Sequence, residues 1–135
     1  MMADTENAGP AAVATEAIQH ARATEAAVQD LCRVTLSRPA LTPAETADVL
    51  SHLAAAVAAL PQASAQLAEI LDQAKSDQVL ETDNMSDTSD PTLAVDTARL
   101  HLEEAREAAV VLYRLLDAAH QQAAHLISHT TLTPG

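Results

Sequence analysis

The stretch 91–126, PTLAVDTARLHLEEAREAAVVLYRLLDAAHQQAAHL, decides the fold class of this chain. Its apolar residues recur at alternating spacings of three and four, which is the period of a helix packed along one face. Asp90 and Pro91 open the pattern as an N-cap and a first-turn proline. We therefore expect one long packed helix over 91–129. Its seam comprises Val95, Ala98, Leu102, Ala105, Ala109, Leu112, Leu116, Ala119, Ala123 and Leu126.

A second helix is predicted upstream, over 43–76. The sequence Thr42-Pro43-Ala44-Glu45 combines a capping box with a proline at the first helical position. The three-four spacing continues in phase beyond Pro61, so we expect this proline to kink the helix rather than end it. The seam comprises Leu50, Leu53, Val57, Leu60, Ser64, Leu67, Leu71 and Ala74.

The first helix is predicted over 10–37, between two prolines. Pro10 suits a first helical turn, and Pro39 ends the helix because the residue before a proline is disfavoured in the α region. Its apolar stripe is weaker than the other two, since Thr24 and Glu25 interrupt it.

These three helices predict an all-α fold, organised as one domain over 10–129. The chain of 135 residues has two glycines and 1% aromatic residues, so its core must be built from Leu, Val, Ile and Ala. We expect an up-down-up bundle of three long helices with coiled-coil-like packing. The remaining segments are an acidic flexible linker, 77–90, and tails at 1–9 and 130–135.

The charge of the chain bears on its partners. There are 19 Asp and Glu against 7 Lys and Arg, which gives a net charge of −12. Such a charge repels nucleic acid and anionic membranes, so we expect neither as a partner. An acidic antagonist that imitates DNA toward a basic DNA-binding protein remains an alternative.

The single cysteine, Cys32, excludes an intramolecular disulfide. It lies among Leu31, Val34 and Leu36, which predicts a buried, unreactive thiol. The N-terminal residues lack the basic and apolar regions of a signal peptide, and the longest apolar run is far shorter than a membrane helix. We expect a cytoplasmic protein.

No sequence pattern indicates catalysis, a cofactor or a metal. His125 and His129 have a spacing compatible with metal ligands, but we interpret them as surface residues, since no Glu-x-x-His pair of a di-iron bundle occurs. The carboxylates at 103, 104 and 107 are explained by pairing with arginines on a helix surface. We expect no metal site, no cofactor, no catalytic residue and no enzymatic activity.

Residues 108–119, AAVVLYRLLDAA, carry the candidate functional surface. Only Arg114 and Asp117 are charged, and apolar side chains spread around the helix beyond its seam. A helix that is apolar on more than one side is normally covered on more than one side. Either the other two helices wrap this stretch or the chain self-associates through it, and we favour self-association. The candidate interface residues are Val110, Val111, Tyr113 and Leu115.

Two resemblances bear on origin and function. Tyr113-Arg114-Leu115-Leu116-Asp117 resembles the Tyr-x-x-x-Asp/Glu export signal of small helical-hairpin substrates of the actinobacterial type VII secretion system. The Trp-x-Gly turn of that family is missing, because the chain has no Trp. The stretch 36–71, LSRPALTPAETADVLSHLAAAVAALPQASAQLAEIL, resembles small Ala/Leu-rich helical proteins of high-GC actinobacteria. That resemblance implies a helical fold and an actinobacterial source over 34–126, with no known function.

From these observations we interpret the chain as a non-enzymatic helical-bundle module for protein–protein interaction. It would form a homo-oligomer and recognise a protein partner through helix faces. The alternatives are a secreted or secretion-associated helical substrate of the type VII kind, and an acidic antagonist of a DNA-binding protein.

Overall fold

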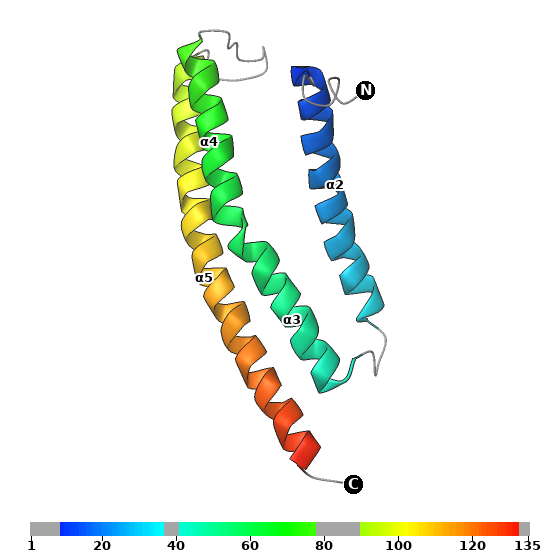
Figure 1. Ribbon diagram of the computed structural model, residues 1–135. Helices are drawn as coiled ribbons and strands as arrows, with labels where there is room; N and C mark the ends of the chain where they lie inside the picture. The colour runs from blue at the N-terminus through cyan, green and yellow to red at the C-terminus, as the bar shows by residue number, and fades with distance from the viewer. Residues whose placement is uncertain (1–8, 37–40, 78–89, 133–135) are drawn as a thin grey trace. The chain divides into compact units, whose positions relative to one another are not determined.

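The computed structural model describes residues 9–36, 41–77 and 90–132, with side chains as far as Leu126. These ranges hold no strand, which confirms the all-α prediction (Figure 1). The expected linker over 78–89 and the outermost tail residues lie outside the described residues. The chain divides into two compact units, Met1–Thr42 and Pro43–Gly135, where we expected one domain. The helices are α2 (Pro10–Val34), α3 (Pro43–Ala58), α4 (Leu60–Ser76) and α5 (Pro91–Leu132).

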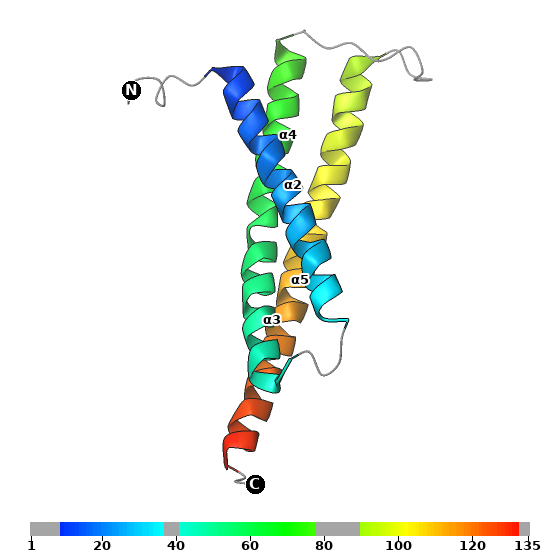
Figure 2. The same cartoon turned by 90° about the vertical axis from the view of Figure 1, so that its right-hand side faces the viewer.

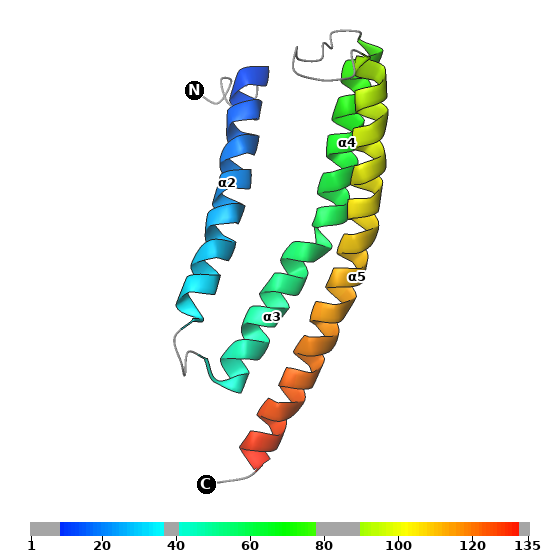
Figure 3. The ribbon, with the colours of Figure 1, turned by 180° about the vertical axis from the view of Figure 1, so that it is seen from behind.

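Three helices pack together in the second unit. Both α4 and α3 lie along α5, α4 beside its first half and α3 beside its second half (Figures 1 and 3). Viewed at 90° to Figure 1, α5 runs obliquely past the other two helices (Figure 2). The pairing is antiparallel, since Lys75 Nζ lies 2.9 Å from Asp96 Oδ1 and His120 Nδ1 lies 2.9 Å from the Ala47 carbonyl oxygen.

The buried core of this unit is built from small side chains. The buried hydrophobic residues are Ala47 and Ala54 on α3 and Val95 and Ala109 on α5. Alanine at such positions lets two helix backbones approach closely, and the larger Leu side chains then pack at the edges of the contact. The hairpin that α3 and α4 form with α5 is therefore held by a narrow line of contact rather than by a thick core.

The contact of α3 and α4 with α5 includes only some residues of the predicted seam. The structure leaves Leu60 45% and Leu67 53% exposed, although both were predicted to be inward. A contact between two helices covers a narrower arc than a bundle does, so alternate seam residues fall outside it. The buried or half-buried positions contain an unbroken three-four series of Ala47, Leu50, Ala54, Val57, Pro61, Ser64, Ala68, Leu71 and Lys75.

The seam of α5 divides in the same way. Leu112 and Leu126, which we predicted to be inward, are exposed, as are Ala105 and Ala119. The other seam residues are buried or half-buried, namely Val95, Ala98, Leu102, Ala109, Leu116 and Ala123. Both predicted seams thus contain one set of residues that the hairpin covers and another that it does not.

The predicted kink at Pro61 is a complete break. The helix ends at Ala58 and a new one starts at Leu60, with Ala59 between them (Figure 1). Proline has no backbone N–H to continue the helical ladder, and its ring crowds the preceding turn. The Ala59 N–H donates instead to the Ala56 carbonyl at 3.2 Å, and the Ala63 N–H donates to the Ala59 carbonyl at 3.2 Å.

The ends of α5 have local causes. At its start the Asp90 carboxylate accepts the Thr92 N–H at 2.9 Å, which satisfies a donor that the helix itself leaves unpaired. At its other end the helix continues to Leu132, three residues beyond the predicted end at 129. No helix-breaking residue occurs before Pro134, so the helix has no reason to stop earlier.

The first unit contains the single helix α2, none of whose residues is buried. It ends at Val34 rather than at 37, and beyond it the Leu36 N–H donates to the Arg33 carbonyl three residues back, at 3.4 Å. Cys32 is exposed, so the prediction of a buried thiol is wrong.

Candidate functional site

The side of α5 that faces away from its buried seam is also apolar. Val111 is 54% exposed and Leu115 is 64% exposed, and Leu93 and Leu100 on the same side are exposed as well. Residues two apart on a helix lie on opposite sides, so Val111 lies opposite buried Ala109. The helix therefore has an apolar stripe on each of two opposite sides, and α3 and α4 cover one of them.

The second stripe is densest in its middle, where four exposed apolar residues follow at spacings of three and four. We call Ala108, Val111, Leu115 and Ala118 the outer patch. Such spacing places their side chains next to one another on the helix surface. Glu104 interrupts the stripe before the patch and Gln122 ends it.

Two of the four interface residues predicted from the sequence belong to the outer patch. Val111 and Leu115 are in it, while Val110 is half-buried on another side of the helix. Tyr113 is exposed but lies two residues from both Val111 and Leu115, and so points away from the patch. The sequence analysis missed Ala108 and Ala118, which a search for a second three-four series opposite the seam would have found.

A second apolar series on α3 and α4 contains Leu60 and Leu67, the two predicted seam residues that the hairpin leaves exposed. Its members recur at spacings of three and four and lie beside the line of contact with α5. Leu60, Leu67 and Ile70 are exposed, while Leu53 and Ala74 are half-buried. We call the series Leu53, Ala56, Leu60, Ala63, Leu67, Ile70 and Ala74 the lateral stripe.

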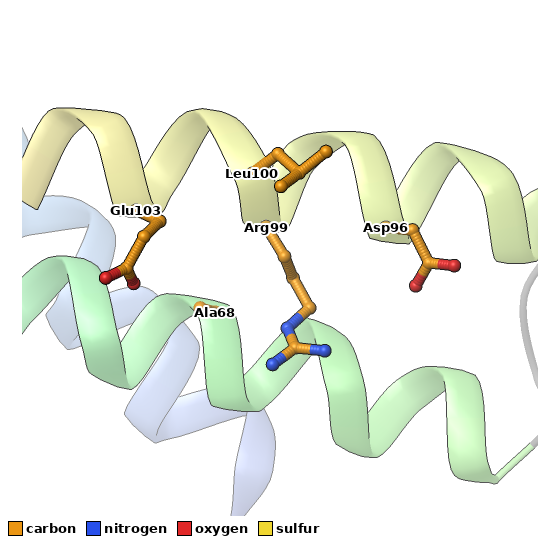
Figure 4. Close-up of a pocket in the computed structure, with 5 residues that line it drawn as sticks. All are labelled: Ala68, Asp96, Arg99, Leu100 and Glu103. Carbon is orange, nitrogen blue, oxygen red and sulfur yellow. The ribbon is translucent and has the colours of Figure 1, made fainter.

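A shallow groove between α4 and α5 gathers charged side chains rather than apolar ones (Figure 4). Arg99 extends toward α4, where its Nη1 lies 3.2 Å from Asp72 Oδ1. Asp96 pairs with Lys75, and Glu103 pairs with Arg106 at 3.6 Å. Because these charges are already paired, the groove offers no unpaired group to a ligand. The pairs Arg99–Asp72 and Asp96–Lys75 join α5 to α4. The lining residues are Ala68, Asp96, Arg99, Leu100 and Glu103.

The remaining candidate motifs lie at separate places. Among the residues that the structure describes, no three His, Cys, Asp or Glu side chains cluster as a metal site requires. The side chain of His129 lies outside the described residues. Tyr113 and Asp117 sit one turn apart within α5, and the Asp117 carboxylate accepts the Gln121 amide at 3.0 Å.

The stretch Pro43–Ser76 is, by length and composition alone, apolar enough to cross a membrane. This is a weak indication, because core helices of soluble proteins meet the same criterion. Only 6% of its most apolar window is buried, however. The apolar character of α3 and α4 therefore exceeds what packing against α5 uses, in agreement with the lateral stripe.

Comparisons of the chain with known protein families, with characterised proteins and with solved structures give no match.

Proposed function

We propose that this chain is a non-enzymatic helical module for protein–protein interaction that self-associates through the outer patch. The observation that carries the proposal is the exposure of Val111 and Leu115, 54% and 64%, in the middle of a helix whose opposite side is packed. Contiguous apolar side chains on the surface of a folded protein usually mark a contact with another macromolecule.

The size of the outer patch predicts a weak complex. Complete burial of a Val or Leu side chain contributes about 1.5–3 kcal/mol, and these two are already partly covered. Association of two proteins costs at least about 4 kcal/mol of lost freedom of movement. We therefore expect self-association that depends on concentration in the micromolar range or above.

We also propose that the three long helices form the up-down-up bundle that their sequences predict. Short connections make neighbouring helices antiparallel, and residues 35–42 are the only link between α2 and α3. The residues of both predicted seams that the hairpin leaves uncovered are those that a third helix would contact.

Light scattering of three variants tests the proposed function. Val111→Glu and Leu115→Glu place a charge in the outer patch and should convert the oligomer to a monomer. Leu36→Glu is the matched control, since Leu36 is 83% exposed and lies outside α5. It should leave the oligomer intact. A wild-type chain that stays monomeric at about 1 mM would contradict the proposal.

Hydrogen exchange tests the placement of α2. In the wild-type chain the amides of α2 should exchange at least about tenfold more slowly than in the isolated 9–36 peptide, because packing suppresses fraying. Leu60→Glu should remove that protection, whereas Leu93→Glu should retain it. Equal exchange in the peptide and in the full chain would show that α2 does not pack on the hairpin.

A further inference from the structure

We infer that the partner on the outer patch is a second copy of this chain, with the two α5 helices antiparallel about a two-fold axis beside Val111. The inference rests on the proposed self-association and adds its geometry. It starts from two charged residues, Glu107 and Arg114, that border the outer patch on one edge.

These two residues are the charges on which the geometry depends. They are seven positions apart, so they lie on one line of the helix surface, on either side of the level of Val111. Both are exposed, and neither forms an ion pair within the ranges that the structure describes. The other arginines of α5 differ, because Arg99 pairs with Asp72 and Arg106 pairs with Glu103.

The charges favour an antiparallel arrangement. In a parallel, in-register pair each residue faces its own copy, so the acidic residues Glu104 and Glu107 would meet their equivalents and repel. A two-fold axis perpendicular to the helices, placed midway between Glu107 and Arg114, exchanges these two positions. Each Glu107 then lies beside Arg114 of the second copy, and the contact occurs twice, as in any isologous interface.

The same axis also matches the sizes of the apolar residues. Val111 is next to the axis, so it meets Val111 of the second copy. Leu115 lies about 3 Å along the helix from Ala108 of the second copy, less than one helical turn, so that a large side chain lies beside a small one, and symmetry repeats this contact. One axis thus pairs opposite charges at the edge and complementary volumes in the middle, both of which a specific interface requires.

Charge exchange tests this geometry. Glu107→Arg alone sets two pairs of arginines against each other, and Arg114→Glu alone sets two pairs of glutamates against each other. Each variant should raise the dissociation constant of the dimer at least about tenfold. An equimolar mixture of the two variants should form a heterodimer. In it, the arginine introduced at position 107 of one chain faces the glutamate introduced at position 114 of the other chain, and the native Arg114 faces the native Glu107. Glu69→Arg on α4 makes the same change of net charge away from the patch and should leave the dimer unchanged.

The outcomes separate this inference from the proposed function. If the wild-type chain dimerises but the mixture shows no preference for the heterodimer, self-association stands and the antiparallel geometry is wrong. If the wild-type chain does not dimerise, both fail.

Cross-linking provides a second measurement that does not depend on affinity. In a Cys32→Ser background, Val111→Cys should form a disulfide-linked dimer with copper–phenanthroline, because the axis brings the two copies of position 111 together. Leu115→Cys should not, because the two copies of position 115 lie about 13.5 Å apart along the helix at 1.5 Å per residue. Equal cross-linking at both positions would indicate a parallel pair and overturn the inference.

Discussion

The two sides of α5 differ in their surroundings more than in their residues. Val95 on the inner side is 5% exposed, and Leu93, two residues before it on the outer side, is 52% exposed. Both are aliphatic residues in the same turn of one helix, so the difference comes from α4, which covers one side only. The comparison shows that the chain carries more apolar surface than its own hairpin can bury. The outer side needs another cover, and we assign that role to a second copy.

The largest expected difference between the two sides follows from placing the same charge on each. Ala109→Glu puts a carboxylate in the contact between α3 and α5 and should lower the free energy of unfolding by about 3 kcal/mol or more. Val111→Glu, two residues away, should change the stability of the monomer by no more than about 0.5 kcal/mol. Urea denaturation of dilute protein, followed by circular dichroism, measures both. Equal losses would mean that the outer side is also a packed surface of the monomer.

Removal of apolar volume should show the same contrast with a smaller effect. Val95→Ala should cost about 2 kcal/mol, because it removes two buried methyl groups and leaves a gap. Leu93→Ala should cost less than about 0.5 kcal/mol in the monomer, since its side chain is largely in water. Thermal unfolding of the two variants provides the measurement. A larger loss for Leu93→Ala than for Val95→Ala would reverse the assignment of inner and outer sides.

His120 should contribute less, through one hydrogen bond between the helices. It is half-buried, and its Nδ1 lies 2.9 Å from the Ala47 carbonyl oxygen. His120→Ala should lower the free energy of unfolding by about 1 kcal/mol. His52→Ala is the control, because His52 is exposed on α3, and it should have no measurable effect. An equally small effect for both would mean that the contact adds nothing to the hairpin.

The smallest effect is expected for the ion pairs that join α4 to α5. Arg99 and Asp72 are both about half exposed, so Arg99→Met should cost about 0.5 kcal/mol in dilute salt. In 1 M NaCl that cost should vanish, because the charges are screened. Arg22→Met on α2 serves as the matched control. A cost that persists in 1 M salt would assign the role of Arg99 to packing of its aliphatic stem rather than to its charge.

The helices themselves were predictable because their signals are local. The starts at Pro43 and Pro91 depend on a proline and the residue before it, and the Asp90 cap depends on a hydrogen bond two residues long. The break at Ala59 was only half predictable. The sequence shows that Pro61 disturbs the ladder, but whether the helix bends or restarts depends on how α4 and α3 fit along α5.

Which side of each helix is buried could not be predicted, because burial depends on contacts between residues that are distant in the sequence. Leu60 and Pro61 are neighbours in the sequence, but in the structure Pro61 is half-buried and Leu60 is exposed. The same reasoning explains Cys32, whose apolar neighbours indicated burial although α2 buries no residue. For the proposed interface, the composition of 108–119 pointed to the segment that carries the outer patch. Which of the four candidates belong to the outer patch could be decided only once the structure showed which side of α5 is buried. Val111 and Leu115 lie in the patch, whereas Val110 and Tyr113 do not.

We propose that α5 is covered on its inner side by its own chain and on its outer side by a second copy. The most direct measurement is methyl NMR of the Val and Leu residues with a soluble paramagnetic probe, at low and at high protein concentration. The Val95 methyl groups should be shielded at both concentrations, and those of Leu36, which is 83% exposed outside α5, should be accessible at both. The Val111 and Leu115 methyl groups should be accessible in dilute protein and become shielded as the concentration rises. Val111 and Leu115 methyl groups that remain as accessible as those of Leu36 at every concentration would contradict this arrangement.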